Sequence, residues 1–492
     1  MQRILNEDRL LNHGNQTARE LCLDIIDHGL VAADPFYNTK QLIRMDGDTL
    51  VFEGTDYEPA QDPKSGTARY ALTPSTRVFL FAIGKGIQYA AKAVEDTLGD
   101  RLTGGYVIAK HGDPILMERL EVMLGGHPVP DSCCVEGCRR MLQVISDAQL
   151  TSDDLVITII GNGVSSLMTL PSDDIPLEDI IRCVEILQIE NGVATSELNH
   201  IRNNIDQLKG GRITKLLYPA KMVHLLAVPP TVNDTHSCTG YNALLTNNFW
   251  LHTLPDCTST DHALKYLNRL EIEDQLPASI LHVLHHGSRC PKGISTEEFI
   301  SCDCRVFALM PECKDATSIA LNRAKELGLR PYLLTKKTQC EASAIGKFLS
   351  CMVQHCHNDY SPFRAPCALI FSGELLVTCG ENSGVGGRNQ EFCLSAALAL
   401  HGNERVALAA VDTDGTDGPG GYICDDAERL GVRVLAGAII DGSTASTARK
   451  LQIDLSTALS RHDTSRILWE LGDGIITTHN VSIGDLACCV IL

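Results

Sequence analysis

A short apolar run that ends in a glycine turn and continues into a helical pattern occurs repeatedly along this sequence. In the first example, the apolar residues 77–83 end at Gly84-Lys85-Gly86, and a helical pattern follows over residues 89–94. Similar apolar runs lie at residues 155–160, 222–228, 305–309, 368–371 and 406–411. Continuous apolar runs that alternate with helices are typical of buried parallel strands. The repeated pattern therefore predicts an α/β fold along the whole chain.

The length of the chain and one break in the pattern predict two domains. A chain of 492 residues exceeds the usual size of one domain. The segment 287–293 interrupts the pattern and places a boundary between residues 287 and 302, so the predicted domains are 1–295 and 300–492. The prediction leaves open whether the segment from about residue 473 onward packs on the first domain or on the second.

Two local predictions concern the first domain. Residues 16–30 have a helical pattern that ends before Asp34-Pro35, where the residue preceding proline disfavours helix. The polar residues 56–75, which include proline and glycine, predict a loop.

The acidic balance of the chain limits its expected partners. The chain carries 42 basic and 61 acidic residues, a formal charge of −19, and its pI is about 5.3. Such a surface repels nucleic-acid backbones and anionic lipids, so neither nucleic acid nor a membrane is an expected partner. No apolar run reaches membrane-spanning length, residues 1–8 do not have the pattern expected of a secretory signal, and the 20 cysteines are scattered. We expect a cytoplasmic protein with free thiols, and a homodimer is compatible with these features.

Two glycine turns follow predicted strands and are candidate anion-binding loops. In Gly84-Lys85-Gly86, a lysine lies at the carboxyl end of a buried strand, where open α/β sheets bind ligands. The alternative is a surface lysine at a helix start. In Gly161-Asn162-Gly163-Val164-Ser165-Ser166, backbone N–H groups could converge on an anion at a helix N-terminus. The alternative is a tight turn with Ser165 as the helix N-cap. Neither turn has the pattern of a phosphate loop or of a serine-hydrolase elbow.

A third glycine-rich segment, residues 380–391, contains an arginine. Gly384, Gly386 and Gly387 lead into Arg388, whose guanidinium fork suits a phosphoryl group. The alternative is a flexible surface loop with a solvated arginine. Gly384-Val385-Gly386 alone is a weak dinucleotide signal, although Asp412 follows the next predicted strand at a compatible spacing.

Three aspartates in six residues follow the predicted strand 406–411. Asp412, Asp414 and Asp417 lie on a glycine loop and could hold magnesium or act as a base on a substrate hydroxyl. The alternative is an Asx-rich turn. The paired cysteines and histidines elsewhere, such as Cys302-Asp303-Cys304 and His355-Cys356-His357, lack zinc-ligand spacing, and no metal is assigned to them.

In this order, the segments resemble the type II glycerate kinases, which make 2-phosphoglycerate from D-glycerate and ATP. The resemblance runs from about residue 32 to the end of the chain. It is carried by Ala32-Ala33-Asp34-Pro35, Gly126-His127-Pro128-Val129-Pro130-Asp131, Ile201-Arg202, Gln207-Leu208-Lys209-Gly210-Gly211, Gly384-Val385-Gly386-Gly387-Arg388-Asn389-Gln390-Glu391 and Thr413-Asp414-Gly415-Thr416-Asp417-Gly418-Pro419.

The resemblance implies a fold, cofactors and a set of site residues. It implies a Rossmann-like N-terminal α/β domain and a smaller C-terminal α/β domain, with the active site in the cleft between them. ATP and Mg²⁺ are the implied cofactors. Lys85, Arg388 and Asp414 are the implied catalytic residues, and Asp417 and Asp234 are the implied Mg²⁺ ligands, with Asp414 and Asp417 able to exchange the roles of ligand and base. The implied substrate- and phosphate-binding residues are Gly161, Asn162, Gly163, Ser165, Arg202, Lys209, Gly384, Gly386, Gly387 and Asn389.

This chain departs from the family pattern in several loops. Val164 stands where the family has a glycine that would let a ligand come close. One acid is lost in the segment 228–234, and the segments 310–312, 462–464 and 477–482 also differ. Because Lys85, Arg388 and the aspartate loop are kept, we expect an ATP-dependent kinase of D-glycerate or a related small sugar acid. Two alternatives remain open: a non-catalytic metabolite-binding paralogue and a hydroxypyruvate reductase. The reductase is disfavoured because a full dinucleotide fingerprint is missing.

Overall fold

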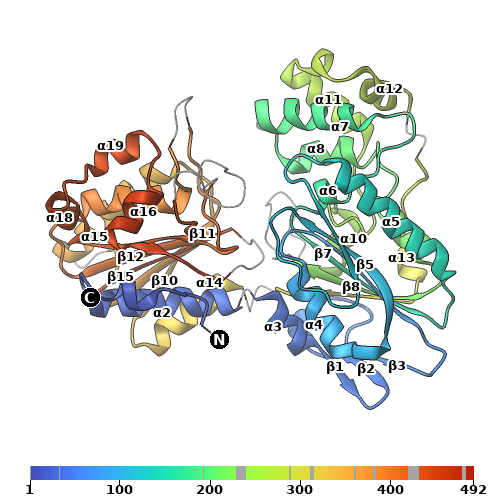
Figure 1. Ribbon diagram of the computed structural model, residues 1–492, viewed down its shortest axis with the longest axis horizontal. Helices are drawn as coiled ribbons and strands as arrows, with labels where there is room; N and C mark the ends of the chain where they lie inside the picture. The colour runs from blue at the N-terminus through green and yellow to red at the C-terminus, as the bar shows by residue number, and fades with distance from the viewer. Residues whose placement is uncertain are drawn as a thin grey trace. The chain divides into compact units, whose positions relative to one another are not determined.

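Two six-stranded sheets, one in each of two units, organise the computed structural model of the chain (Figure 1). We call Pro35–Glu312 the parallel unit, and Met1–Asp34 together with Cys313–Leu492 the mixed unit. The structure describes residues 2–32, 34–191, 193–228, 240–287, 290–310, 315–359, 362–379, 384–418, 432–478 and 484–492.

All strands of the large sheet in the parallel unit run in the same direction. Their spatial order is β6 (Glu121–Gly125), β5 (Leu102–Lys110), β4 (Val78–Ile83), β7 (Leu155–Gly161), β8 (Lys221–Ala227) and β9 (Cys304–Ala308). The chain builds outward from β4 in one direction and then returns to build outward in the other, as in a doubly wound Rossmann sheet. The reversal lies between β4 and β7, so the loops after these two strands flank the switch point, where such sheets bind ligands.

Helices cover both faces of the parallel sheet. One face packs on α4 (Gln88–Leu98) and on an antiparallel sheet of β1 (Ile43–Asp46), β2 (Thr49–Phe52) and β3 (Ala68–Ala71). The other face packs on α5 (Ser132–Ala148), α6 (Val164–Leu167), α9 (Arg212–Leu217), α10 (Tyr241–Thr246) and α13 (Thr296–Ser301). A separate helical cluster contains α7 (Leu177–Val184), the π-helix Glu185–Glu190, α8 (Thr195–Arg202), α11 (Thr260–Leu270) and α12 (Ala278–His286), and α3 (Pro35–Leu42) packs on α4 (Figure 1).

The prediction of a loop over residues 56–75 is wrong for β3. Ala68–Ala71 pairs with β2 in an antiparallel register, and only one face of this strand is buried. An edge strand with one exposed face needs few apolar residues, so its sequence resembles a loop.

The sheet of the mixed unit combines parallel and antiparallel pairs. Its order is β10 (Arg330–Thr338), β11 (Cys367–Gly373), β15 (Asp485–Ile491), β12 (Val406–Asp412), β13 (Gly437–Asp441) and β14 (Gly474–Ile475). Only β10 and β11 are parallel; the other neighbours are antiparallel. One face packs on α15 (Ala342–Asp359), α16 (Arg388–Ala399), α18 (Thr444–Lys450), α19 (Leu455–Ser460) and α20 (Ser465–Leu471).

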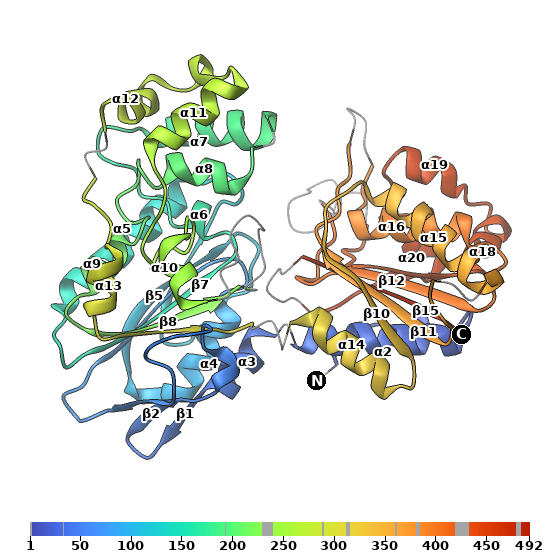
Figure 2. The same cartoon turned by 180° about the vertical axis from the view of Figure 1, so that it is seen from behind.

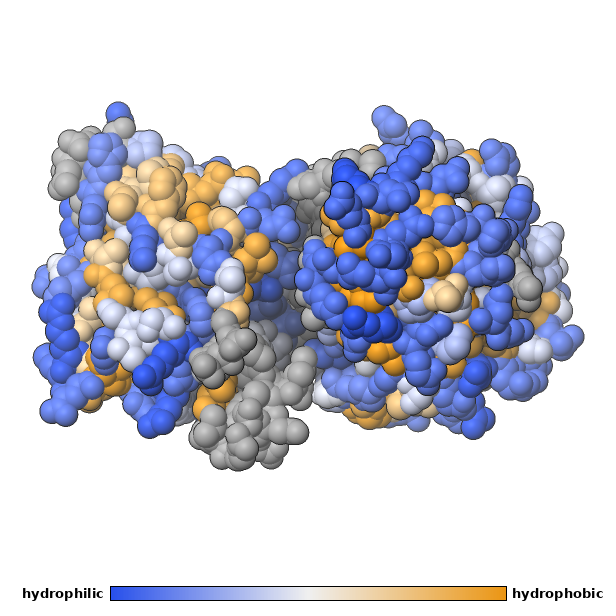
Figure 3. All heavy atoms as spheres, turned by 90° about the horizontal axis from the view of Figure 1, so that it is seen from above, coloured by the Kyte–Doolittle hydropathy of each residue, from blue (hydrophilic) through white to orange (hydrophobic). Residues whose placement is uncertain are grey.

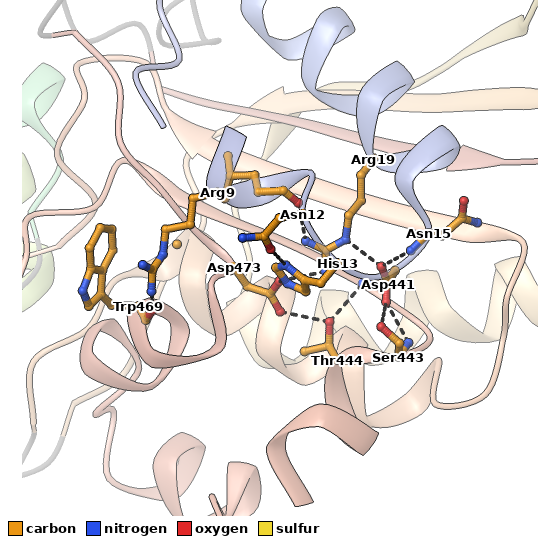
Figure 4. A network of polar contacts seen from close by, with 12 residues as sticks. Arg9, Asn12, His13, Asn15, Arg19, Asp441, Ser443, Thr444, Trp469 and Asp473 are labelled. Carbon is orange, nitrogen blue, oxygen red and sulfur yellow. Dashed lines mark hydrogen bonds and ion pairs between the residues drawn. The ribbon is translucent and has the colours of Figure 1, made fainter. Parts of the chain in front are cut away.

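The first residues of the chain cover the other face of the mixed sheet. There α2 (Gln16–Ala32) packs beside α14 (Ala316–Glu326), and the short α1 (Glu7–Leu10) precedes α2 (Figure 2). Arg19 of α2 is fully buried and donates to Asp441 at 2.6 Å and to Asp473 at 2.7 Å (Figure 4). Two buried carboxylates therefore hold the first helix on this unit through a charge-assisted contact.

This division differs from the predicted domains 1–295 and 300–492. Residues 1–34 belong to the mixed unit, because the apolar face of α2 and Arg19 find their partners there. The parallel unit extends through β9, which pairs with β8. The last strand, β15, does not join the first domain but lies between β11 and β12, where every residue from Asp485 to Ile491 is buried. The predicted helix at 16–30 is confirmed as α2.

Hydrophilic side chains cover much of the face shown in Figure 3, with hydrophobic side chains gathered in patches between them. Among the described residues, no helix is both long and apolar enough to span a bilayer.

Candidate functional site

The loops that follow β4 and β7 touch one another at the switch point of the parallel sheet. The backbone N–H of Lys85 donates to the carbonyl oxygen of Asn162 at 2.7 Å. A Cβ atom on Gly84 would lie 2.8 Å from the Cα atom of Gly161, so the two loops approach more closely than side chains would allow. The predicted loops Gly84-Lys85-Gly86 and Gly161-Asn162-Gly163 are thus parts of one local structure.

Lys85 and His127 pack against the same glycine. Gly163 has φ +81°, and a Cβ atom there would lie 2.8 Å from Lys85 Cγ and 3.0 Å from His127 Cδ2. A glycine is therefore required at position 163 for two reasons: the backbone is left-handed there, and two side chains come too close for a Cβ atom. The ammonium of Lys85 forms no hydrogen bond or ion pair with any residue that the structure describes. The sequence analysis quoted His127 within a motif but gave it no role.

Three positive side chains act on the imidazole of His127. Burial of the ring, followed by the charges of Lys85, Lys110 and Arg202, lowers the pKa of His127 well below its ordinary value. We call Lys85, Lys110 and Arg202 around His127 the cation cluster. Because like charges gathered at one site raise the local potential, this cluster attracts anions despite the negative charge of the whole chain.

Arg202, the last residue of α8, is buried, and its positive charge has little compensation from neighbouring groups. Within the described part of the chain, the polar partner of its guanidinium is Gln188, at 3.2 Å, and no carboxylate pairs with it. Burial lowers the pKa of Arg202 to about 10. A buried cation without an anion is unfavourable, so the carboxylate or phosphate of a ligand would compensate the charge. The structure therefore places a predicted binding residue in the cation cluster.

Two other predicted binding residues form contacts with neighbouring side chains of this protein. The ammonium of Lys209 pairs with Asp206 at 2.6 Å and donates to Thr169 at 3.2 Å, fully buried. The hydroxyl of Ser165 accepts from Asn199 at 2.9 Å and lies 3.1 Å from His252 Nε2. The alternative role of Ser165 as an N-cap is wrong, because α6 begins at Val164 with Gly163 as its N-cap. These contacts favour structural roles for Lys209 and Ser165, whose predicted binding roles stay predictions.

Val164 does not fill the space above the glycine loop. Its side chain is fully buried in the hydrophobic core, on the face of the sheet covered by α5 and α6. The expectation that this departure from the family pattern obstructs a ligand is therefore not supported by the position of the side chain.

In the mixed unit, Arg388 opens α16 and is surrounded by carboxylates. Its guanidinium donates to Asp485 at 2.8 Å, to Asp412 at 2.9 Å and to Glu374 at 3.1 Å. Burial alone would lower the pKa of Arg388, but the charges of these carboxylates raise it above its ordinary value. The side chain is mostly buried, which argues against a solvated surface arginine. Three of its five N–H groups are used, so two remain for a ligand.

Asp412 and Asp414 add a surplus of negative charge around Arg388. Burial and the neighbouring charge of Asp414 raise the pKa of Asp412 well above its ordinary value. Asp414 is half-buried and accepts two hydrogen bonds from Thr416 through Oδ1, whereas its Oδ2 has no hydrogen-bond partner within the described ranges. We call Glu374, Asp412 and Asp485, which contact Arg388, together with Asp414 beside Asp412, the carboxylate cluster. Oxygen ligands with surplus negative charge suit a divalent cation such as Mg²⁺.

Asp417 has a different position, at the N-terminus of α16. Its carboxylate accepts from the backbone N–H groups of Asn389, at 3.1 Å, and Gln390, at 2.9 Å. Burial, followed by the charge of Asp485, raises the pKa of Asp417 to about 6. The carboxylate thus satisfies two helix N–H groups that would otherwise lack partners, which leaves it poorly placed as a metal ligand. The other predicted ligand, Asp234, lies outside the described residues.

The glycines before α16 are explained by close packing. A Cβ atom on Gly387 would collide with Asp417, and Cβ atoms on Gly384 and Gly386 would collide with the segment 462–464. Asn389 is fully buried, and its side chain donates to Asp417 and Asp485. These residues build the loop that presents Arg388, and their predicted phosphate-binding roles stay predictions.

Sequence analysis missed several residues of the two clusters. Asp485 carried a usable signal, because it directly precedes the apolar run 486–491 and thus flanks a strand. Lys110 likewise ends a strand, β5. Glu374 follows β11 in an exposed position and offered no signal.

Comparison with known proteins was made on sequence and on structure. Residues 21–238 match a family model described as a domain of unknown function (DUF4147), and residues 367–482 match the MOFRL family. The D-glycerate 2-kinase of Thermotoga maritima is 34% identical over 406 residues, which are 82% of this chain and 87% of that relative. The glycerate 2-kinase of Pyrococcus horikoshii is 28% identical over 459 residues, 93% of this chain and 94% of the relative.

A crystal structure of glycerate kinase from Thermotoga maritima has the same fold. It superposes with a TM-score of 0.71 at 29% sequence identity and covers 96% of this chain and 99% of its own. The parallel-sheet unit, the mixed-sheet unit and the level of identity agree, and the chain belongs to the glycerate kinase family.

Proposed function

We propose that this protein transfers the γ-phosphoryl group of ATP to a hydroxyl of D-glycerate or of a related small sugar acid. The observation that carries the proposal is the cation cluster at the switch point of a doubly wound sheet, in which neither Lys85 nor Arg202 pairs with a carboxylate of the described residues. Such a site suits a small anion. The names of the relatives from Thermotoga and Pyrococcus support this choice of reaction.

The cationic residues have distinct roles in this proposal. Arg202 pairs with the carboxylate of the acid, because a planar fork binds a carboxylate through two hydrogen bonds. Lys85 lies against the glycine loop and neutralises charge on the transferred phosphoryl group. Arg388 offers its remaining N–H groups to phosphate oxygens. Phosphoryl transfer depends mainly on positioning and on charge stabilisation, and these side chains supply both.

The residues of the carboxylate cluster fit Mg²⁺ better than Asp417 does. Oδ2 of Asp414, which no described residue contacts through a hydrogen bond, and the raised pKa of Asp412 indicate negative charge that a divalent cation would neutralise. When bound, Mg²⁺ would neutralise the phosphate oxygens of ATP. We therefore assign Asp414, with Asp412, to the cation, and Asp417 to the support of α16.

The two alternative functions make different predictions. The glycines that suggested a dinucleotide fingerprint pack against residues 462–464 and Asp417, which gives them a structural explanation and disfavours a reductase. A non-catalytic paralogue would bind the acid without releasing ADP. It would have no need for an unpaired lysine beside the glycine loop.

The proposal is tested by ADP release coupled to NADH oxidation, with Mg²⁺ and ATP. The acids to compare are D-glycerate, L-glycerate and a panel of four- and five-carbon sugar acids. Lys85→Met should reduce kcat at least about 100-fold without unfolding the protein, because one electrostatic contact is lost and no ion pair is broken. Lys92→Met, which removes a lysine of α4 paired with Glu118 at 2.9 Å, is the matched control.

The outcomes separate the three functions. Turnover of at least one acid that is lost in Lys85→Met supports the kinase. Binding of ATP without ADP release on any acid would support the paralogue. Oxidation of NADH or NADPH by hydroxypyruvate in the absence of ATP would support the reductase.

A further inference from the structure

The imidazole of His127 lies among the side chains of the cation cluster. It lies in the connection between β6 and α5, and its ring packs against Gly163 beside the side chain of Lys85. Neither ring nitrogen is hydrogen-bonded to a residue in the described ranges. Two fully buried histidines of this unit are each bonded through one ring nitrogen: His224 to Thr158 at 2.7 Å, and His252 to Ser165 at 3.1 Å. The side chain of His127 is only half-buried, so its unbonded ring nitrogens are accessible to a ligand or to a substrate hydroxyl.

The charges that face His127 are all positive. They come from three elements: Lys85 from the loop after β4, Lys110 from the end of β5, and Arg202 from the end of α8. Among the described residues, no carboxylate contributes to the pKa shift of His127. The carboxylate of Asp113 interacts instead with Lys85 and Lys110, and it accepts from the backbone N–H of Gly86 at 2.9 Å. In the free protein the ring is therefore neutral at physiological pH, and one of its nitrogens carries a lone pair that can accept a proton.

We propose that His127 is the general base that accepts the proton of the substrate hydroxyl during phosphoryl transfer. This inference rests on the proposed kinase function. As the hydroxyl oxygen forms its bond to the γ-phosphorus, the bond from that phosphorus to the β–γ bridging oxygen breaks, and its electron pair leaves with ADP. The hydroxyl proton moves to a ring nitrogen of His127, which later releases it to water.

The cation cluster makes the basicity of His127 depend on the substrates. The carboxylate of the acid and the phosphates of ATP bring negative charge to Lys85, Lys110 and Arg202, so the repulsion that disfavours the imidazolium falls. The ring then becomes a stronger base in the complex than in the free protein. Proton acceptance is thereby favoured only when the site holds its anions.

A purely structural role for His127 is the competing explanation, because the ring fills space beside Gly163. His127→Gln retains a polar side chain of similar size but cannot accept the proton. His111→Gln is the matched control, because His111 is exposed and pairs with Asp131 at 2.6 Å. Circular dichroism and thermal unfolding check that each variant is folded, and His127→Asn replaces the glutamine variant if that one is not.

The experiment measures kcat and KM for the acid and for ATP between pH 5 and 9. For His127→Gln we expect kcat to fall by about 100- to 10,000-fold, KM values to change less than about 3-fold, and the acidic limb of the profile to vanish. In the wild type, the acidic limb of kcat should lie at higher pH than the limb of kcat/KM, because the substrates raise the pKa of His127. His111→Gln should retain the wild-type profile.

Either of two kinetic results would overturn the assignment. If wild type and His127→Gln turn over at similar rates with the same pH profile, His127 is not the base while the kinase function stands. If wild type shows no turnover on any acid, the proposed function fails and this inference fails with it. A direct readout is the imidazole C–H proton resonance of His127, identified by its absence in the variant. Its titration should move to higher pH when D-glycerate and adenylyl imidodiphosphate are added, and an unchanged titration contradicts the proposal.

Discussion

The two clusters have opposite electrostatic characters. The cation cluster gathers three positive side chains around one neutral imidazole, whereas the carboxylate cluster gathers three acids around one guanidinium, with Asp414 beside Asp412 as a fourth. In each case the charge left over points to the ligand that the residues lack: an anion for the first and a cation for the second. A substrate acid and a magnesium nucleotide together supply both kinds of charge.

At the residue scale, Asp414 should control the affinity for Mg²⁺. Asp414→Asn removes a negative charge but keeps an oxygen that can accept from Thr416, so the turn should persist. We expect the Mg²⁺ concentration for half-maximal activity to rise at least about 10-fold, because fewer charged ligands bind the cation less tightly. Glu404→Gln, an exposed acid of the same unit, is the control. An unchanged Mg²⁺ requirement would remove Asp414 from the metal site.

Asp417 should make stability depend on pH in one direction. Its pKa is about 6 in the folded protein, above the value of about 3.9 expected in the unfolded chain. The folded state therefore binds this proton more tightly, and the stabilising contribution is present below about pH 4 and lost as pH rises through about 6. We expect the unfolding free energy of wild type, relative to Asp417→Asn, to fall by up to about 3 kcal/mol between pH 4 and 7. Urea unfolding of both proteins at several pH values measures the difference, and a rise would contradict the assignment.

Val164 should matter for stability and not for substrate choice. Its side chain is buried in the core, so Val164→Ala removes packing contacts and should lower the unfolding free energy by about 2 kcal/mol. The ratio of kcat/KM values among the sugar acids should stay constant within about 2-fold, which the ADP-release assay measures. A variant that accepts larger acids would show that this position borders the substrate after all.

At the scale of elements, α2 depends on one buried arginine. Arg19 is fully enclosed and joins Asp441 of β13 to Asp473, which directly precedes β14 (Figure 4). A buried ion pair contributes little net stability by comparison with apolar packing, but removal of one partner leaves the others unpaired and buried. The attachment of α2 is therefore sensitive to the loss of the arginine charge.

Arg19→Leu is expected to lower the unfolding free energy by about 3–5 kcal/mol, because Asp441 and Asp473 lose their cation. Arg323→Leu is the matched control: this arginine also reaches α2, through Asp24 at 2.7 Å, but it is partly exposed. The control substitution should lower the unfolding free energy by less than about 1 kcal/mol. Chemical unfolding measures the loss of unfolding free energy in both variants. Equal losses would show that burial of the Arg19 ion pairs does not increase their contribution to stability.

At the scale of the whole molecule, the division into units predicts which pieces fold. The fragment 35–310 contains the complete parallel sheet with helices on both faces, so it should unfold cooperatively by itself. The fragment 315–492 lacks α2 and exposes the core that α2 covers, so it should fold only when a peptide of residues 1–34 is added. Circular dichroism and thermal unfolding test both. Stable folding of 315–492 without the peptide would contradict this view of the mixed unit.

Much of the architecture could be predicted from local patterns. The apolar runs at 155–160, 222–228 and 406–411 agree with β7, β8 and β12 to within a residue at each end. The glycine turns after the first strands also pointed to Lys85, because a strand, a turn and a helix start leave their signals within about fifteen residues. The order of the strands was not predictable, since pairing joins residues far apart in the chain.

Hydrophobic periodicity and turn residues were thus sufficient for the fold class, for most central strands and for the candidates Lys85 and Arg388, whereas Arg202 was a candidate only through the resemblance to the glycerate kinases. Tertiary structure decided which of the charged candidates retain groups for a ligand. Arg388 meets Asp485, 97 residues away, and Arg19 meets Asp441, 422 residues away. The structure also showed that His127 has no hydrogen-bond partner among the residues it describes, while Lys209 is paired with Asp206. The physical reason is that strand and turn propensities act over short stretches of chain, whereas burial and charge pairing arise only when distant segments pack together.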